Sequence, residues 1–453
     1  MFQRESGPRI AVIERATPAD LTVRAISARG QVPQHMGAVL LLDGCGFDVD
    51  AAERLLVERA RSIPRLRQRL RPVPPGCGRP VWLDDPGFDG RRHVRHMTCP
   101  PPGDEQALLD LAAAVVTRPL PPSRPLWSAV FVTDLAGGDA ALILAVDHVL
   151  TDGLGGLAVL SELLDDCPTS AADILARPAS TLADLAVDAF RERLRSVSRL
   201  PQFLRDAGVA ARDGNAARLV SARRCSLTRR TGPKRRVNVL RADLAGLKAA
   251  AHLHGGTLND AVLTAVTGAL RELLKARGET VDELAVMMPV ALRRTTDTGH
   301  LGNQINPMIV TLPADGDSGQ RLTRITVAVR KAKKAATHPS LIALLGPVFL
   351  LATRLGLHRW WMAHQRFMHT LVTNVRGPEQ AMSLGGSLIG EIIPMPVSEN
   401  GNMPVTFAVL SYAGSVSISV IADPDALPDL PDLTAALRRQ LAALHEQGPL
   451  APR

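Results

Sequence analysis

The sequence predicts a mixed α/β protein made of two halves, and three observations support this fold class. The chain has 453 residues, more than one hydrophobic core usually covers, so two or three domains are expected. Strand-like apolar runs alternate with segments of helical spacing on both sides of the range 168–236. That range itself is helical in pattern and basic. We therefore expect an N-terminal half over 1–167, a crossover linker over 168–236 and a C-terminal half over 237–453.

In the first half, apolar residues separate into strand-like and helix-like patterns. Short apolar runs predict strands at Ala38–Leu42, from about Phe88 onward, at Trp127–Thr133 and at Ala140–Val146. Helical spacing predicts helices at Val49–Leu70, Leu108–Val116 and Leu154–Leu164. The proline-rich stretch Pro72–Pro86 is expected to be a loop. Pro178 and Pro201 are expected to interrupt the helical linker that follows.

The second half shows the same alternation. Strands are predicted from Val237 and at Leu284–Pro289, Ile305–Leu312, Leu371–Asn374, Val405–Ser411 and Ser415–Ile421, the last two as a hairpin. Helices are predicted at Leu244–His252, Thr257–Lys275 and Leu433–His445. Thr257 and Asp260 form an acidic variant of the capping box, so Asn259 and Asp260 should lie in the first turn of their helix.

Charge and composition restrict the partners of the protein. The net charge of +9 and the pI of about 9.9 indicate an anionic partner. Nucleic acid is not expected, because no binding module and no interleaved aromatic residues are visible. The acid-free basic run Arg223–Arg236 fits a solvated linker face as well as it fits contact with an anionic membrane or with the phosphates of coenzyme A.

Cysteine usage and hydropathy point to a cytoplasmic protein. Five scattered cysteines without CxxC spacing predict neither a disulfide framework nor a zinc site, and we expect no metal. The N-terminus lacks the apolar core of a signal peptide. A membrane-spanning helix needs about 18 apolar residues, and no apolar run in the sequence is that long. The run that comes nearest to this length, Leu341–Thr353, is interrupted by Gly346 and Pro347.

The segment Ala141–Leu157 is the strongest functional signal in the chain. Its apolar run ends at Asp147 and His148, and Asp152 with Gly153 then predicts a turn before a helix. A histidine at such a strand end can face a substrate cavity, and its ordinary pKa near 6.5 suits a general base. Asp152 is expected to hold the turn in place. His35, at the start of a strand, and His93 and His96 are interpreted as structural.

Several segments together carry a family resemblance: DHVLTDG at 147–153, RPLW at 124–127, LND at 258–260, PVALR at 289–293 and NVRGP at 374–378. They resemble the bacterial wax ester synthase/diacylglycerol acyltransferase family, within the superfamily of CoA-dependent acyltransferases that carry an HHxxxDG motif. The likeness covers about residues 15 to 445. It implies two chloramphenicol-acetyltransferase-like α/β domains with an active-site tunnel between them.

One departure from the family motif affects the site. Asp147 replaces the first motif histidine, whereas the second, which acts as the base in the superfamily, corresponds to His148. The resemblance therefore assigns catalysis to His148, Asp152 and Gly153. A carboxylate within hydrogen-bond reach would raise the pKa of His148, so Asp147 could modify the base.

The resemblance implies direct acyl transfer, with acyl-CoA as co-substrate and no cofactor. The acceptor would be diacylglycerol or a long-chain alcohol, which would give triacylglycerol or wax esters. Asn259, or the free N–H groups of its helix start, would hold the oxyanion, although Asn259 and Asp260 fit a purely helix-capping role equally well. With no spanning segment, contact with membrane or lipid droplets should be peripheral and salt-sensitive.

Two other functions fit parts of the sequence. A carrier-protein-dependent acyltransferase or condensation-type domain shares the HxxxDG element, and the run Arg223–Arg236 could dock an acidic carrier. A non-catalytic lipid-binding relative is suggested by Asp147 alone. Acyl chain length, acceptor preference and oligomeric state are not determined by the sequence.

We also predict an ion-pair partner for Asp152. Its carboxylate should face the interior, where an unpaired charge costs several kcal/mol, so a cation must come from elsewhere in the chain. Arg293 follows the predicted strand Leu284–Pro289, and related acyltransferases have an arginine after a similar strand. Arg376, in the NVRGP turn, is the second candidate.

Overall fold

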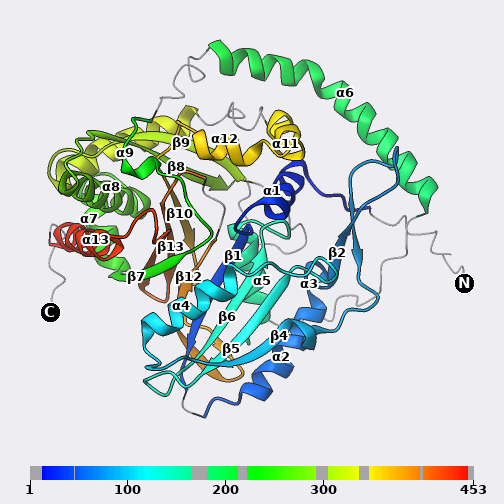
Figure 1. Ribbon diagram of the computed structural model, residues 1–453, viewed down its shortest axis with the longest axis horizontal. Helices are drawn as coiled ribbons and strands as arrows, with labels where there is room; N and C mark the ends of the chain where they lie inside the picture. Colours follow the sequence, from blue (N-terminus) through cyan, green and yellow to red (C-terminus); the bar gives the residue numbers. More distant parts are fainter. Residues whose placement is uncertain are drawn as a thin grey trace, which may run out of the picture.

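Two six-stranded sheets form the framework of the protein (Figure 1). The computed structural model describes residues 13–44, 46–165, 181–212, 222–291, 305–335, 346–397 and 401–446. Within these residues, every helix is too short or too polar to cross a bilayer. The mixed α/β fold class predicted from the sequence is confirmed.

The first sheet holds the strand that ends at the motif. In spatial order its strands are β11 (Ser383–Leu384), β12 (Ser387–Pro394), β1 (His35–Leu42), β6 (Ala140–Asp147), β5 (Trp127–Thr133) and β4 (Val94–Thr98). All eight residues of β6 are buried, as expected for a central strand covered on both faces. β11 and β12 come from the second half of the sequence, yet β12 pairs antiparallel with β1.

The second sheet belongs entirely to the later part of the chain. Its strands are β7 (Arg236–Asp243), β14 (Ser415–Ala422), β13 (Val405–Tyr412), β10 (Thr370–Arg376), β8 (Glu283–Ala291) and β9 (Ile305–Pro313). β10 runs parallel to both of its neighbours, β13 and β8. The predicted hairpin is present: β13 and β14 pair antiparallel, and Ala413 and Gly414 take positive φ in its turn.

Helices flank the two sheets, except that the long α6 (Leu182–Arg212) runs along the outside of the molecule (Figure 1). The other helices of the first part are α1 (Pro18–Arg29), α2 (Val49–Ser62), α3 (Pro64–Arg67), α4 (Glu105–Val116) and α5 (Gly153–Leu163). Those of the second part are α7 (Leu244–Leu253), α8 (Leu258–Ala276), α9 (Ser318–Ala335), α11 (Gly346–Arg354), α12 (His358–His364) and α13 (Leu430–His445). Helix α8 is apolar on nearly all sides because α7, α9 and α13 surround it.

Three apolar clusters form the core, and one of them joins the two sheets. Val39 of β1 and Ile143 of β6 belong to the same cluster as Val237 of β7 and Ile421 of β14, with α4 beside them. The other two clusters each belong mainly to one sheet and its helices. The two sheets are therefore held together by continuous apolar packing.

Several of the predictions for single elements were wrong. The helix predicted over Val49–Leu70 ends at Ser62, because Pro64 cannot continue it, and the chain then forms α3 and β2 (Gln68–Arg71). The predicted loop Pro72–Pro86 contains β3 (Val81–Asp84), which pairs with β2 and buries Trp82. Pro201 lies inside α6 and does not end it, so the interruption predicted there was also wrong. The strand predicted from about Phe88 begins only at Val94, because a 3₁₀ turn precedes it. The short 3₁₀ turns Gly90–His93 and Ser226–Thr228 complete the described elements.

Candidate active site

The motif residues lie where β6 ends and α5 begins. The backbone N–H of His148 donates to the carbonyl of Gln34 at 2.8 Å, so the residue is held against the start of β1. The N–H of Leu150 donates to the carbonyl of Asp147 at 2.9 Å and closes a tight turn. Thr151 and Asp152 after this turn are fully buried or nearly so. The local sequence thus places the side chain of His148 at a fixed point.

His148 lines a cavity of about 440 Å³ between the two sheets. Apolar side chains form most of its wall, as is usual for small-molecule sites. The first sheet and α5 contribute Met36, Gly37, Leu144, Val146, Asp152, Gly153, Leu157 and Ile392. The second sheet contributes Pro289, Thr373, Asn374, Val375, Arg376, Ala408 and Leu410. His148 itself is half-buried, so one side of its ring remains accessible from the cavity.

Asp152 and Gly153 begin α5 beside His148. Oδ1 of Asp152 accepts from the N–H of Gly155 at 3.0 Å, which makes Asp152 the N-cap of the helix. Gly153 also lines the cavity, and a Cβ at this position would lie 3.4 Å from a methyl group of Val375. This separation is an ordinary van der Waals contact, so an alanine would fit at this position. The structure therefore explains the aspartate of the Asp-Gly pair, as the cap of α5, and does not show a need for the glycine.

Asp147 lies behind the cavity wall and faces a buried histidine. His35 pairs with it across β1 and β6, and Nε2 of His35 lies 3.9 Å from Oδ2 of Asp147. Oδ1 of Asp147 accepts from the N–H of Val149 at 2.8 Å. Asp147 therefore supports the turn that carries His148. Its suggested effect on the pKa of His148 stays a prediction.

Burial shifts the pKa of both members of this pair. Nδ1 of His35 lies 2.7 Å from the carbonyl oxygen of Val116, which can only accept, so Nδ1 carries the proton and Nε2 is an acceptor. Burial lowers the pKa of His35 to about 4 and raises the pKa of Asp147 to about 6. Both shifts favour the uncharged forms, as expected for groups withdrawn from water.

The predicted pairing of Asp152 with Arg293 lies outside the described residues, because they do not include 292–304. The second candidate, Arg376, lines the cavity but forms an ion pair with Glu379, and its side chain is 76% exposed. Asp152 is 1% exposed, so its carboxylate is inside the protein, as predicted. The Arg293 assignment therefore stays a prediction.

A double-mutant cycle tests that assignment. We expect Asp152→Asn and Arg293→Gln each to lower the free energy of unfolding by about 3 kcal/mol or more, because each leaves a buried charge unpaired. Asparagine caps helices as well as aspartate does, so the cap of α5 is retained. The double variant should lose much less than the sum of the single losses. Additive losses in urea unfolding would show that the two residues do not interact.

Asn259 and Asp260 lie in the first turn of α8, as predicted. Oδ2 of Asp260 accepts from the N–H and the hydroxyl of Thr257, both at 2.8 Å, so Asp260 caps the helix. Asn259 is half-buried, and its Oδ1 accepts a weak hydrogen bond of 3.4 Å from Nδ2 of Asn374. Among the described residues of the cavity wall, Asn374 rather than Asn259 supplies the amide. We did not predict Asn374 as a site residue, although it belongs to the NVRGP segment used for the resemblance.

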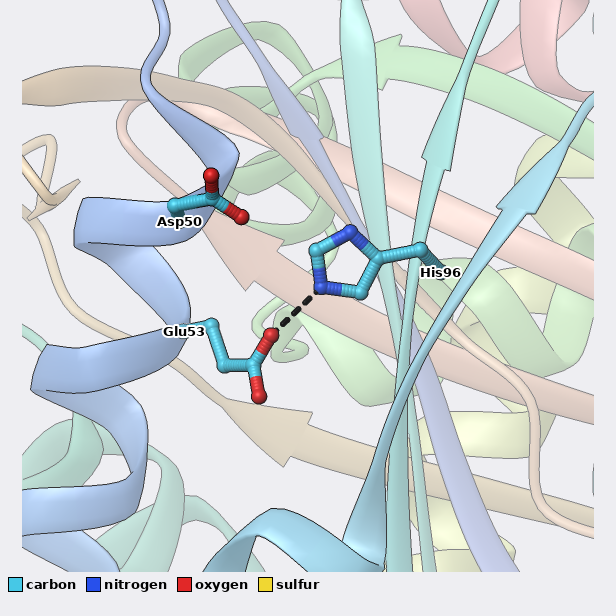
Figure 2. A group of neighbouring side chains, drawn as sticks. All are labelled: Asp50, Glu53 and His96. Carbon is cyan, nitrogen blue, oxygen red and sulfur yellow. Dashed lines mark hydrogen bonds and ion pairs between the residues drawn. The ribbon is translucent and has the colours of Figure 1, made fainter.

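The other histidines of the first half make structural contacts. His93 is buried, stacks on Trp127 with ring centroids 4.4 Å apart, and has Nδ1 2.9 Å from the carbonyl oxygen of Trp127. His96 lies on the edge strand β4, with Nε2 2.6 Å from Oε2 of Glu53 (Figure 2).

Glu53 and His96, with Asp50, form a group of potential metal ligands outside the cavity. One possible ligand atom from each lies within 4.8 Å of the others (Figure 2). The three side chains are exposed or half-exposed. Asp50 and Glu53 lie near the N-terminal end of α2, where acidic residues interact favourably with the helix dipole, and His96 reaches them from β4. The contact between His96 and Glu53 and this dipole account for the group, so we assign no metal to it.

Two family models match the chain. The wax ester synthase/diacylglycerol acyltransferase catalytic domain matches residues 18–262, and the C-terminal domain of the same family matches residues 301–445. Together the two matches cover most of the 453 residues and include the motif, the start of α8 and the cavity strands β10 and β13.

Curated relatives and solved structures agree with these matches. The chain is 28% identical over 421 residues, 90% of each chain, to the protein named "Probable diacyglycerol O-acyltransferase tgs1" of Mycobacterium tuberculosis (strain ATCC 25618 / H37Rv). It is similar in fold to the wax ester synthase/diacylglycerol acyltransferase from Marinobacter aquaeolei VT8, with a TM-score of 0.67, 23% identity and coverage of 95% of this chain and 98% of that one.

A more distant neighbour is a doubly substituted starter condensation domain of the rhizomide synthetase RzmA in complex with C8-CoA. Its TM-score is 0.61 at 14% identity, with coverage of 96% of this chain and 94% of that one. These likenesses confirm the chloramphenicol-acetyltransferase-like two-domain fold. The chain belongs to the wax ester synthase/diacylglycerol acyltransferase family and is an acyltransferase.

Proposed function

We propose that this acyltransferase moves the acyl group of an acyl-CoA onto the hydroxyl of a lipid alcohol, with His148 as general base. Diacylglycerol would give triacylglycerol, and a long-chain alcohol would give a wax ester. The observation that carries the proposal is the position of His148 at the wall of an apolar cavity between the sheets. A base at such a wall can act on a hydroxyl whose alkyl chain fills the rest of the cavity.

The reaction would need no covalent enzyme intermediate. The neutral imidazole of His148 takes the hydroxyl proton while the alcohol oxygen bonds to the thioester carbonyl carbon. When the tetrahedral intermediate collapses, its C–S bond breaks, and the departing thiolate takes the proton from the imidazolium. Ester and free coenzyme A are the products. Asp152 and Gly153 would act on the geometry of His148 and not on the substrate's bonds.

Hydrogen-bond donors must stabilise the oxyanion of the intermediate, typically by about 3 kcal/mol each. Asn259 remains one candidate, together with the N–H groups at the start of α8. Asn374 is an additional candidate, because it lines the cavity and its amide has a second N–H besides the one directed at Asn259. We further propose that the enzyme is cytoplasmic and contacts a membrane or lipid droplet peripherally, where lipid acceptors are found.

The direct test offers the purified protein a mixture of acyl-CoAs with diacylglycerol and a long-chain alcohol, followed by mass spectrometry of the lipids and measurement of free coenzyme A. We expect triacylglycerol, wax ester or both, together with stoichiometric coenzyme A. A parallel reaction supplies the acyl groups on a carrier protein. Transfer from the carrier alone would favour a condensation-type function, and no transfer from either donor would overturn the proposal.

A further inference from the structure

A group of large apolar side chains on α11, α12 and their connection is exposed to solvent. This α11–α12 patch consists of Leu351, Leu355, Leu357, Trp360 and Trp361. Leu355 is 66% exposed and Trp360 is 65% exposed, which is unusual for leucine and tryptophan. Several such residues within one short segment mark an interaction surface more often than chance exposure does.

The inner side of the same segment is firmly seated on the protein. Thr353 and His358 are completely buried, and the guanidinium of Arg29 on α1 donates to the carbonyls of Thr353 and Arg354. Trp360 follows His358 by two residues, which places it roughly 200° around the helix. The apolar side chains therefore point outward because the opposite side is already packed.

The charged residues of the segment that carries the patch are all basic. Residues 346–366 contain Arg354, Arg359 and Arg366, all exposed, and no aspartate or glutamate. Arg230, from the basic run Arg223–Arg236, places Nη2 2.5 Å from Nε2 of His364 at the end of α12. Exposed tryptophan and leucine with a basic rim are the pattern of segments that lie in the surface of an anionic membrane.

Helix α6 also exposes apolar side chains and lies on the same side of the molecule, above α12 and α11 in Figure 1. Its inner face docks through buried Ala189 and through the ion pair of Asp188 with Arg15 at 2.6 Å. Its opposite face carries four exposed apolar residues at helical spacing: Val187, Phe190, Leu194 and Val197.

The patch is also connected to the cavity through the fold. Helix α1, which packs on α11, leads into β1, whose Met36 and Gly37 line the cavity. Strand β10, which follows α12, contributes Thr373 and Asn374 to the opposite wall. A lipid surface held at α11–α12 would thus lie next to the two segments that lead to the cavity strands.

We propose that the α11–α12 patch, together with the apolar face of α6, is the surface by which the enzyme binds an anionic lipid surface. This deepens the proposed function, since it places the source of the lipid acceptor against named residues. The apolar side chains insert among the lipids, and the arginines contact the phosphate headgroups.

Vesicle flotation with tryptophan fluorescence tests the assignment. Vesicles of phosphatidylcholine with one-third phosphatidylglycerol are compared with vesicles of phosphatidylcholine alone. Trp82 and Trp127, the other two of the four tryptophans, are buried, so a blue shift on binding reports Trp360 and Trp361. We expect the wild-type protein to float with the anionic vesicles and to show this shift, and added salt should weaken binding.

Matched triple variants show whether vesicle binding depends on the α11–α12 patch or on exposed apolar residues in general. Leu355→Gln, Leu357→Gln and Trp360→Gln together should lower partition to vesicles about tenfold or more. The control combines Leu253→Gln, Val327→Gln and Leu388→Gln, which are equally exposed elsewhere, and should bind like the wild type. Replacing Phe190, Leu194 and Val197 on α6 by glutamine should also weaken binding. Equal binding by all variants, or equal loss in the control, would overturn the proposal.

Activity on soluble substrates and the oligomeric state distinguish lipid binding by the patch from other effects of the substitutions. With a short-chain acyl-CoA and a water-soluble alcohol, the α11–α12 variant should release coenzyme A at the wild-type rate, whereas its activity on diacylglycerol in vesicles should fall with binding. A wild-type protein that binds anionic vesicles but transfers no acyl group to diacylglycerol or a long-chain alcohol would contradict the proposed function while leaving the binding result intact. If the α11–α12 variant instead changes a dimer into a monomer by light scattering, with vesicle binding unchanged, the patch is a protein interface and the proposal is wrong.

Discussion

His148→Ala is expected to lower kcat for acyl transfer by about 10²- to 10⁴-fold, the usual contribution of a general base. The effect should fall on kcat more than on KM, because the imidazole acts on the transition state and the apolar wall that binds the acyl chain is unchanged. The fold should persist, since His148 is half-buried at a cavity and its backbone N–H still bonds to Gln34. Free coenzyme A, measured with saturating acyl-CoA and acceptor, gives the rate.

The matched control for this variant is His96→Ala. His96 lies on the edge strand of the same sheet and pairs with Glu53 outside the cavity, so its removal should leave the rate within a few-fold of the wild type. Thermal unfolding of both variants checks that the fold is retained. If His148→Ala keeps activity within a few-fold of the wild type, His148 is not the base.

Asp147→Asn is expected to stabilise the protein at neutral and higher pH. Burial raises the pKa of Asp147 from its ordinary 3.8 to about 6, so its stabilising contribution is complete below pH of about 4 and is lost as the pH rises through about 6. Asparagine does not ionise and therefore avoids this loss. A change of this size in pKa corresponds to about 3 kcal/mol in the free energy of unfolding at pH of about 8.

The substitution keeps the main contact of Asp147, because an asparagine Oδ1 can accept from the N–H of Val149. Its amide can also donate toward Nε2 of His35, which has no proton. Urea unfolding should show that the free energy of unfolding of the variant increases relative to that of the wild type as the pH rises. His35 is present in both proteins, so its own titration largely cancels in the comparison.

Asp110→Asn, at an exposed position of α4, is the control and should show no such pH-dependent gain. Activity gives a second readout for the same residue. Asp147→Asn should retain transfer because the turn of His148 is still supported, whereas Asp147→Ala should reduce it. A variant Asp147→Asn that is less stable than the wild type at pH of about 8 would show that the carboxylate is stabilised by contacts other than those described.

The sequence alone determined the elements whose apolar pattern is long and uninterrupted. β5, β6, α8, the β13–β14 hairpin and α13 were predicted close to their observed bounds, because local periodicity and turn residues decide them. The position of His148 at a strand end was equally local: an apolar run, a turn and the N-cap Asp152 lie within a few residues.

Tertiary structure decided the features that depend on segments far apart in the chain. β12 pairs with β1, about 350 residues earlier, and no local pattern in a segment interrupted by Gly385, Gly386 and Gly390 indicates this. The same pairing brings Ile392 into the cavity, and the approach of β10 adds Asn374, which the sequence did not identify as a site residue. The contact of Asp147 with His35 likewise depends on the register of β1 against β6.

The sequence therefore determined the proposed base and the family of the chain, because both were recognised from short contiguous motifs. Only the tertiary structure decided what surrounds that residue. The cavity wall comes from two sheets, and the outward orientation of the α11–α12 patch follows from the burial of Thr353 and His358 beneath it. Packing selects these neighbours by shape and burial, which a linear pattern of residues does not record.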